Sequence, residues 1–92
     1  MAKFLMLGKY SCEAMQGMTA ERTKKVVSSI EKTGGKVDSM YALLGMYDLA
    51  FIVDFPSVKD ALKTSIVLTK ATDISFSTLP AITVEEFDKM IG

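Results

Sequence analysis

The sequence predicts an α+β fold with the element order βαββαβ and a short helix at the C-terminal end. Three observations lead to this fold class. The hydrophobic pattern switches along the chain between a period of two and a period of 3.6 residues. Thr19, Ser57 and Thr83 stand where helices would begin. Gly45 separates two apolar runs typical of strands. Right-handed crossovers fold this order into a ferredoxin-like plait, a four-stranded antiparallel sheet with both main helices on one face.

The first half of the chain predicts a strand, a loop and a helix. The strand covers residues 3–10 and the loop covers residues 11–18. Thr19 caps the following helix, which Gly34 and Gly35 end as glycines do after a last helical turn. The residues of its inner face are Ala20, Thr23, Val26, Val27 and Ile30.

A hairpin follows, with strands at residues 37–44 and 47–55 and Pro56 ending the second strand. A two-residue loop that begins with glycine favours a type II′ turn at Gly45 and Met46. This turn places Leu44 opposite Tyr47, Ala42 opposite Leu49 and Met40 opposite Phe51.

The second half of the chain predicts a helix, a strand and the terminal helix. Ser57 caps the first of these, with Asp60 at the spacing of a capping box. Its inner residues are Val58, Ala61, Leu62, Ser65, Ile66 and Thr69. The strand covers residues 74–79, and Pro80 ends it. Thr83 and Glu86 form a capping box for the terminal helix, whose apolar residues are Val84, Phe87, Met90 and Ile91, before the final Gly92.

The hairpin register sorts side chains onto the two faces of the sheet. The face with Met40, Phe51, Val53 and Phe55 is almost wholly apolar, so we expect the helices to cover it. The other face mixes apolar and polar residues: Val37, Ser39, Tyr41, Leu43, Asp48, Ala50, Ile52 and Asp54. In the first strand, Phe4 and Met6 point one way and Leu5 and Leu7 the other. Whichever of these two pairs faces the helices, the other pair leaves large apolar side chains on the uncovered face. This predicts a homo-oligomer that forms through that face.

Composition narrows the class of protein. The 92 residues predict a single domain, residues 1–92. Eleven Lys and Arg balance eleven Asp and Glu, so a nucleic-acid or anionic-membrane partner is not expected. The apolar runs are too short for a membrane span or a signal segment. The single Cys12 excludes an internal disulfide and favours a reducing, cytoplasmic location.

The side chains present limit the chemistry. The chain has no His and no Trp, and one Cys, so it lacks the usual ligand set for zinc, copper or haem and any Ser-His-Asp site. We therefore expect no cofactor and no stoichiometric metal. The acid–base candidates that remain are Tyr41, Tyr47, Asp48, Asp54 and Cys12, with Lys9 and Tyr10 at the end of the first strand.

Three of these candidates have a structural and a chemical interpretation. Asp48 is the candidate catalytic residue, a base whose pKa burial would raise, or it accepts amide hydrogen bonds in the hairpin, the commoner role. Tyr41 orients a ligand or, more commonly, packs in an interface. Cys12 is a reactive thiol only if its pKa is lowered, and Lys9 is the one nearby residue that could do so. The seven Met residues suit a core or an interface better than a metal site.

These segments resemble the GYD domain family, small proteins named for a turn of the Gly-x-Tyr-Asp type. The resemblance covers nearly the whole chain. It rests on Phe4-Leu5-Met6-Leu7, Gly17, Thr33-Gly34-Gly35-Lys36, Leu44-Gly45-Met46-Tyr47-Asp48 with Phe55-Pro56, and the tail from Thr83 to Ile91. The resemblance implies a ferredoxin-like protomer that pairs sheet to sheet into a dimeric α/β barrel. It carries over no catalytic residue.

Two functions are consistent with the sequence. The first is a non-catalytic homo-oligomeric domain that binds a small apolar or aromatic molecule between the sheet and its partner. Its ligand-binding residues would be Tyr41, Leu43, Asp48, Ala50 and Ile52. The second is a cofactor-independent isomerase or monooxygenase acting on a small organic substrate, with Asp48 or a tyrosine as the base.

Overall fold

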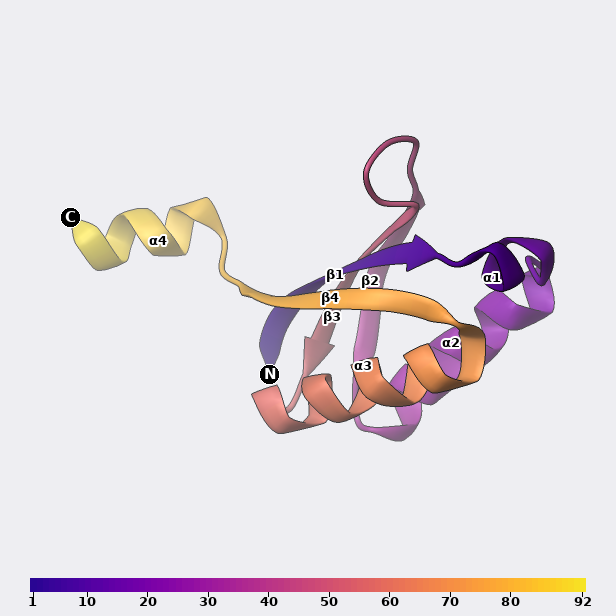
Figure 1. The fold of residues 1–92 in the computed structure, drawn as a ribbon. Coiled ribbons are helices and arrows are strands. Elements are labelled where there is room, and N and C mark those ends of the chain that lie inside the picture. The colour runs from indigo at the N-terminus through magenta and orange to yellow at the C-terminus, as the bar shows by residue number, and fades with distance from the viewer.

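The computed structural model describes residues 1–92 and confirms the predicted α+β plait (Figure 1). The four strands form one antiparallel sheet in the order β2-β3-β1-β4. Helices α2 and α3 lie on one face of this sheet, and α4 stands away from the rest beyond the end of β4. The elements are β1 Ala2–Tyr10, α1 Cys12–Gln16, α2 Ala20–Lys32, β2 Lys36–Ala42, β3 Leu49–Phe55, α3 Val58–Thr72, β4 Ile74–Ala81 and α4 Val84–Ile91.

The predicted helix caps are confirmed. The side chains of Thr19, Ser57 and Thr83 each accept a hydrogen bond from a backbone amide in the first turn of the helix that follows. A fourth cap lies where we expected only a loop, because Ser11 Oγ accepts from the amide of Ala14 at 3.0 Å and begins the short helix α1. The five residues of α1 are too few to produce a helical hydrophobic period, so the pattern missed it.

The hairpin keeps the predicted register but not the predicted turn. Ala42 pairs with Leu49 and Met40 with Phe51, as expected. The strands, however, stop at Ala42 and Leu49, and a six-residue connection replaces the two-residue type II′ turn. A shorter and a longer loop centred on the same point preserve the same register, so the hydrophobic pattern cannot distinguish them. Gly45 has a φ of 142° in this loop, a conformation that favours glycine.

The core lies between the sheet and the two helices. Phe51, Val53 and Phe55 of β3 are buried on the helix face, as predicted for this side of the hairpin. Phe4 and Met6 of β1 join them, which decides the parity of the first strand. The helices complete this core with Val26, Ile30, Ala61 and Leu68.

One residue of β2 lies on the other face from the one predicted. Val37 pairs with Val53 and packs against the core, although regular alternation placed it on the uncovered face. A bulge between Val37 and Ser39 inserts Asp38 and shifts the alternation by one residue. Beyond the bulge, Ser39 and Tyr41 follow the predicted parity.

The residues predicted to face inward on the two main helices are only partly the buried ones. In α3 the buried residues are Ala61, Thr64, Ser65 and Leu68. Val58, Leu62 and Ile66 are exposed although we expected them to be inward, because α3 is rotated so that the neighbouring stripe faces the sheet. In α2, Val26 and Ile30 are buried, but Ala20 and Thr23 in its first turns are exposed.

Strand β4 continues through Pro80, which pairs with Phe4, and does not end at Leu79 as predicted. Proline is tolerated here because β4 is an edge strand with no neighbour on its outer side. None of the helices combines the length and apolarity that crossing a membrane would require.

Candidate functional site

The candidate site is the sheet face that no helix covers, here called the open face. The strand register arranges its side chains in rows that run across the sheet from β4 through β1 and β3 to β2. One row contains Leu79, Leu5, Ile52 and Ser39. The next contains Ser77, Leu7, Ala50 and Tyr41.

The centre of the open face is apolar and accessible. Tyr41 and Leu79 are exposed, and Leu5, Leu7 and Ile52 are half-buried only by their neighbours within the sheet. Ala50 and Ser77 flank Leu7 on either side, so the second row has short side chains beside long ones. The sequence-predicted residues Tyr41, Ala50 and Ile52 are therefore brought together.

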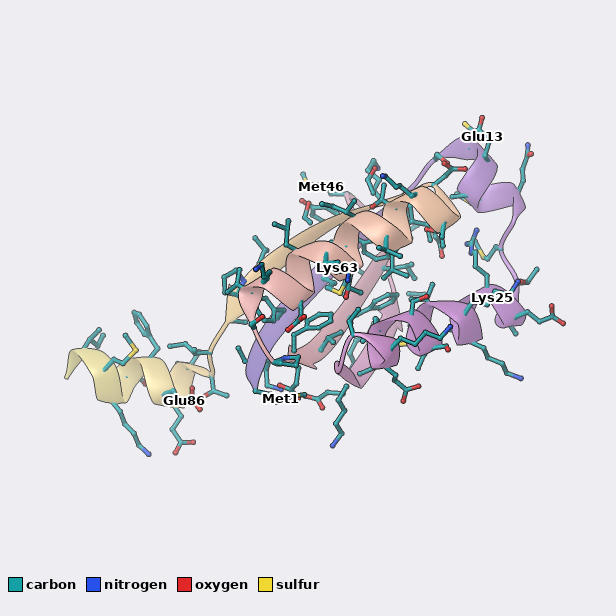
Figure 2. All side chains as sticks on the ribbon, turned by 90° about the horizontal axis from the view of Figure 1, so that it is seen from below. Met1, Glu13, Lys25, Met46, Lys63 and Glu86 are labelled. Atoms are coloured by element: carbon teal, nitrogen blue, oxygen red, sulfur yellow. The ribbon has the colours of Figure 1, made fainter.

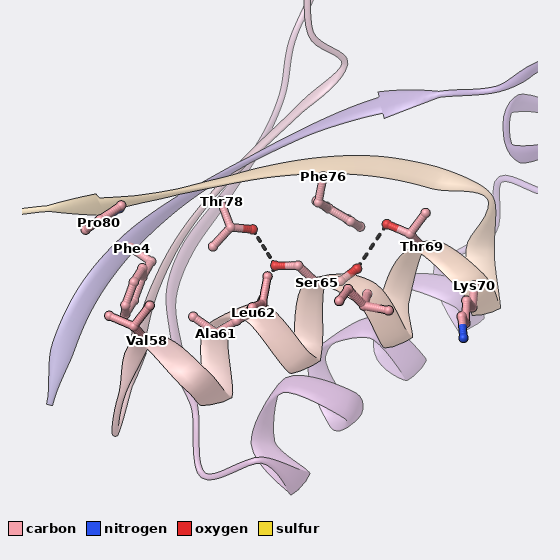
Figure 3. Close-up of a pocket in the computed structure, with 11 residues that line it drawn as sticks. Phe4, Val58, Ala61, Leu62, Ser65, Thr69, Lys70, Phe76, Thr78 and Pro80 are labelled. Carbon is pink, nitrogen blue, oxygen red and sulfur yellow. Dashed lines mark hydrogen bonds between the residues drawn. The ribbon is translucent and has the colours of Figure 1, made fainter.

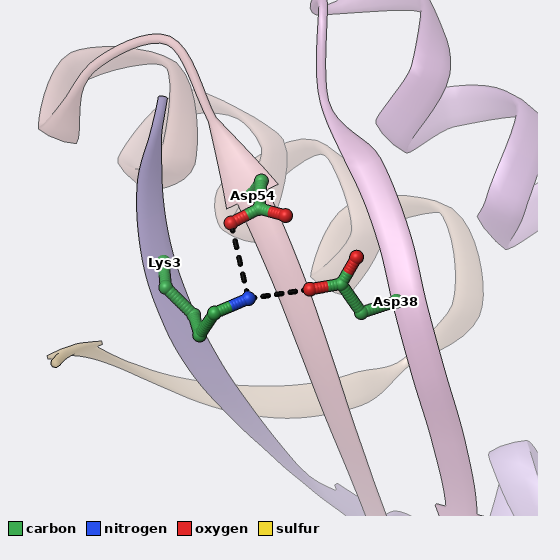
Figure 4. A network of polar contacts seen from close by, with 3 residues as sticks. All are labelled: Lys3, Asp38 and Asp54. Carbon is green, nitrogen blue, oxygen red and sulfur yellow. Dashed lines mark hydrogen bonds and ion pairs between the residues drawn. The ribbon is translucent and has the colours of Figure 1, made fainter. Parts of the chain in front are cut away.

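A charged cluster borders one end of the apolar rows (Figure 4). Lys3 Nζ donates a hydrogen bond to Asp54 Oδ1 at 3.2 Å and another to Asp38 Oδ2. The hydrogen bond from Lys3 lowers the pKa of Asp38 below its ordinary value of 3.8. The hydrogen bond with Asp38 raises the pKa of Lys3 above 10.5. This cluster was not expected from the sequence: Asp54 faces Lys3 in the β1–β3 register, and the bulge in β2 brings Asp38 close to Lys3 as well.

Asp48 lies at the opposite end of the open face, directly before the first residue of β3. Its Oδ2 accepts the backbone amide of Tyr10 at 2.8 Å, and its own amide donates to the carbonyl of Gly8 at 2.8 Å. Its carbonyl also accepts from the amide of Leu43 at 2.8 Å. The carboxylate thus binds the hairpin to the end of β1. This is the structural role expected from the sequence, that of an acceptor for backbone amides.

The other acid–base candidates are dispersed. Asp54 pairs with Lys3, and Lys9 Nζ donates to the carbonyl of Met46 at 3.1 Å. Tyr10 lies under the guanidinium of Arg22, 5.5 Å from the ring centroid. Cys12 is exposed on α1. No group of three or more Asp, Glu, Cys or His side chains gathers where it could hold a metal ion.

The largest hollow lies on the helix side of the sheet rather than on the open face (Figure 3). It has a volume of about 460 Å³ and runs between α3 and β4. Phe4, Leu62, Ile66, Phe76 and Pro80 form its apolar wall. The side chains of Ser65 and Thr78 hydrogen-bond to each other across its floor. This groove was not expected from the sequence, whose helical pattern placed Leu62 and Ile66 in the core.

The fold and the open face define a ferredoxin-like α+β domain with one layer of helices and an uncovered, apolar sheet surface. The GYD domain family matches residues 4–91, so the chain belongs to the GYD domain family. This confirms the resemblance noted from the sequence. No curated protein matches the chain.

Among solved structures, the chain is similar to the crystal structure of Mycobacterium tuberculosis leucine response regulatory protein, LrpA. The TM-score is 0.59 and the sequence identity is 8%, over 89% of this chain and 51% of that chain. The chain therefore spans about half the length of that protein. At this identity the likeness concerns the fold alone.

Proposed function

We propose that this domain is a homodimeric binding module whose copies pair through their open faces and hold a small apolar or aromatic molecule between them. We infer a reducing, cytoplasmic location from the single Cys12. The observation that carries the proposal is the exposure of the apolar rows on the sheet. Burying one fully exposed leucine-sized side chain contributes about 1.5–3 kcal/mol. Leu5, Leu7 and Ile52 are already half-buried, so each contributes a part of this amount, and together they favour pairing.

The distribution of polarity supports an interface. Leu5, Leu7 and Ile52 lie at the centre of the open face. Lys3 with its two carboxylates lies at one end, and Lys9 at the other. A centre of apolar side chains inside a charged rim is the usual anatomy of a protein interface.

The second row supports a ligand site within the pairing. Packed sheets lie about 10 Å apart, and long side chains from both sheets fill this space. Ala50 and Ser77 are too short to do so, and they lie on either side of Leu7. The hydroxyl of Tyr41, which lies beside Ala50 in this row, would meet one polar group of the ligand. A small, mainly apolar or aromatic molecule with one polar group fits this description.

The alternative function, a cofactor-independent isomerase or monooxygenase, requires a base that faces the ligand. Asp48 is bound to the amide of Tyr10, and Asp54 is paired with Lys3. No observation favours this alternative over the binding module.

Light scattering after gel filtration tests the pairing. We expect the parent protein and a Met15→Lys control, changed at an exposed methionine on α1, to share one oligomeric mass. The Ile52→Lys variant buries a charge in the proposed interface and should lose that mass. A monomeric parent protein would refute the pairing.

A fluorescent naphthalene dye tests the ligand site. We expect the parent protein to bind it and Ala50→Phe, which fills the second row, to lose binding while remaining oligomeric. Binding that Ala50→Phe leaves unchanged would place the dye elsewhere and refute the ligand site alone.

A further inference from the structure

Helix α4 carries an apolar stripe that nothing in the chain covers. Val84, Phe87, Met90 and Ile91 lie on one side of this helix because they are spaced by three, three and one residues. Their side chains are 74%, 47%, 73% and 67% exposed. Figure 2 shows α4 standing apart with its side chains projecting into open space. An apolar stripe of this kind marks an interaction site.

The groove between α3 and β4 has the size and chemistry to receive such a helix. It runs along α3 from Val58 to Lys70, about 18 Å at the rise of an α-helix, whereas the eight residues of α4 span about 12 Å. A second hollow of about 380 Å³ adjoins the groove at Phe4, Val58 and Pro80, and its far side is formed by Ile82, Thr83 and Glu86 at the start of the chain's own α4. The groove is also open to solvent, since Leu62 and Ile66 in its wall are exposed.

The charges of the two helices are opposite. Helix α3 has three lysines and one aspartate. The lysines are spaced by four and seven residues, which places them along one edge of the helix, beside Leu62 and Ile66 of the groove. These lysines are Lys59, Lys63 and Lys70. Helix α4 has three carboxylates and one lysine. Glu86 and Asp88 flank its apolar stripe, whereas Glu85 pairs with Lys89 at 3.5 Å on the far side.

The connection between β4 and α4 favours a groove on another molecule. It consists of Ile82 and Thr83, with no glycine. Ile82 is β-branched and favours extended backbone, and Thr83 is held extended at φ −67° and ψ 152° by its capping role. The helix therefore continues outward past the end of β4 and does not turn back onto its own α3 (Figure 1).

We propose that α4 of one copy packs into the α3–β4 groove of a second copy of this chain. The apolar stripe of α4 contacts Leu62, Ile66 and Phe76, and the carboxylate on the flank that faces α3, either Glu86 or Asp88, approaches the lysine edge of that helix. This contact uses the helix side of the sheet, so it is separate from the pairing of the open faces.

Disulfide cross-linking between two differently substituted chains tests the exchange. Both chains carry Cys12→Ser; one also carries Met90→Cys in α4 and the other Ile66→Cys in the groove. Under mild oxidation we expect the mixture to form a cross-linked dimer of the two chains. Adding Phe87→Glu to the first chain should abolish the cross-link, and adding Lys89→Glu, on the far side of α4, should leave it in place.

A single chain with both cysteines distinguishes the alternatives. If it closes an internal disulfide at monomeric mass while the mixed chains do not cross-link, α4 occupies its own groove and the proposal is wrong. No cross-link in either sample also overturns it. An Ile52→Lys background removes the open-face pairing, and we expect the cross-link between mixed chains to persist in it.

Discussion

At the residue scale, Asp48 joins the hairpin loop to β1. Its carboxylate and its amide both reach β1, where they bond to Tyr10 and Gly8. A lost acceptor leaves a half-buried amide unpaired, which costs about 1–3 kcal/mol. The side chain thus holds the exposed loop against the sheet.

We expect Asp48→Ala to lower the free energy of unfolding by about 1–3 kcal/mol, because the amide of Tyr10 loses its acceptor. Asp48→Asn keeps an acceptor oxygen and should lower the melting temperature far less. Thermal melts of both variants beside the parent protein measure this. A clear stabilisation by Asp48→Asn would instead indicate a base held at the cost of stability.

The cluster of Lys3, Asp38 and Asp54 predicts a pH dependence. Since folding lowers the pKa of Asp38, its contribution to stability is present above pH 3.8 and is lost as the pH falls through the lower, folded value. The pKa of Lys3 is raised, so its contribution is full below pH 10.5 and is lost as the pH rises through the higher, folded value. Between these limits the contribution is constant.

Melting temperatures of the parent protein and Lys3→Met across the pH range test this expectation. The difference between the two proteins should be steady near neutral pH and should shrink in acid below pH 3.8. It should shrink again in alkali above pH 10.5. A difference that is the same in strong acid as at neutral pH would contradict the assigned pairing.

At the scale of elements, α3 shows how two adjacent stripes of one helix can have different roles. Leu68 is 1% exposed in the core, whereas Leu62 is 60% exposed in the groove wall. We expect Leu68→Ala to cost about 2–5 kcal/mol in the free energy of unfolding, the usual range for a buried leucine. Leu62→Ala should change it by about 0.5 kcal/mol or less in dilute protein. Urea denaturation measures both, and equal costs would contradict the orientation of α3.

The same helix shows why sequence patterns reach only part of the fold. The order of the main elements, the strand pairing and the caps of α2, α3 and α4 could be predicted, because each depends on local spacing or on the register set by the centre of the turn. The apolar residues of α3 form a stripe wide enough for two orientations, and packing selects between them. Local patterns also carry no signal for the bulge at Asp38.

The candidate site was predictable to a similar extent. The alternation of β2 and β3 placed Tyr41, Ala50 and Ile52 together on the uncovered face, and the structure agrees. The part that Asp38 takes in the cluster around Lys3 could not be predicted, because it depends on the bulge. The α3–β4 groove could not be predicted either, since it exists only because α3 leaves Leu62 outside the core.

On the scale of the whole molecule, a single helix layer against a single sheet leaves little interior. Only 14 of the 92 residues are buried, and the chain extends over 47 × 29 × 18 Å because α4 stands apart. A domain of this size has a marginal core when alone. Association of copies would therefore contribute a large share of the stability.

This association predicts a melting temperature that depends on concentration. When the folded state is stabilised by a partner that the unfolded chain does not bind, a hundredfold rise in partner concentration contributes up to about 2.7 kcal/mol. For a chain of 92 residues this corresponds to a rise of up to roughly 10–20 °C, at about 4–8 °C per kcal/mol. Calorimetry between about 1 and 100 µM protein measures the shift. The parent protein should melt at a higher temperature as its concentration rises. A double variant with Ile52→Lys and Phe87→Glu lacks both proposed contacts. It should melt at a lower temperature, which should not change with concentration. A parent protein whose melting temperature does not change with concentration, and equals that of the double variant, would show that the single domain is stable without a partner.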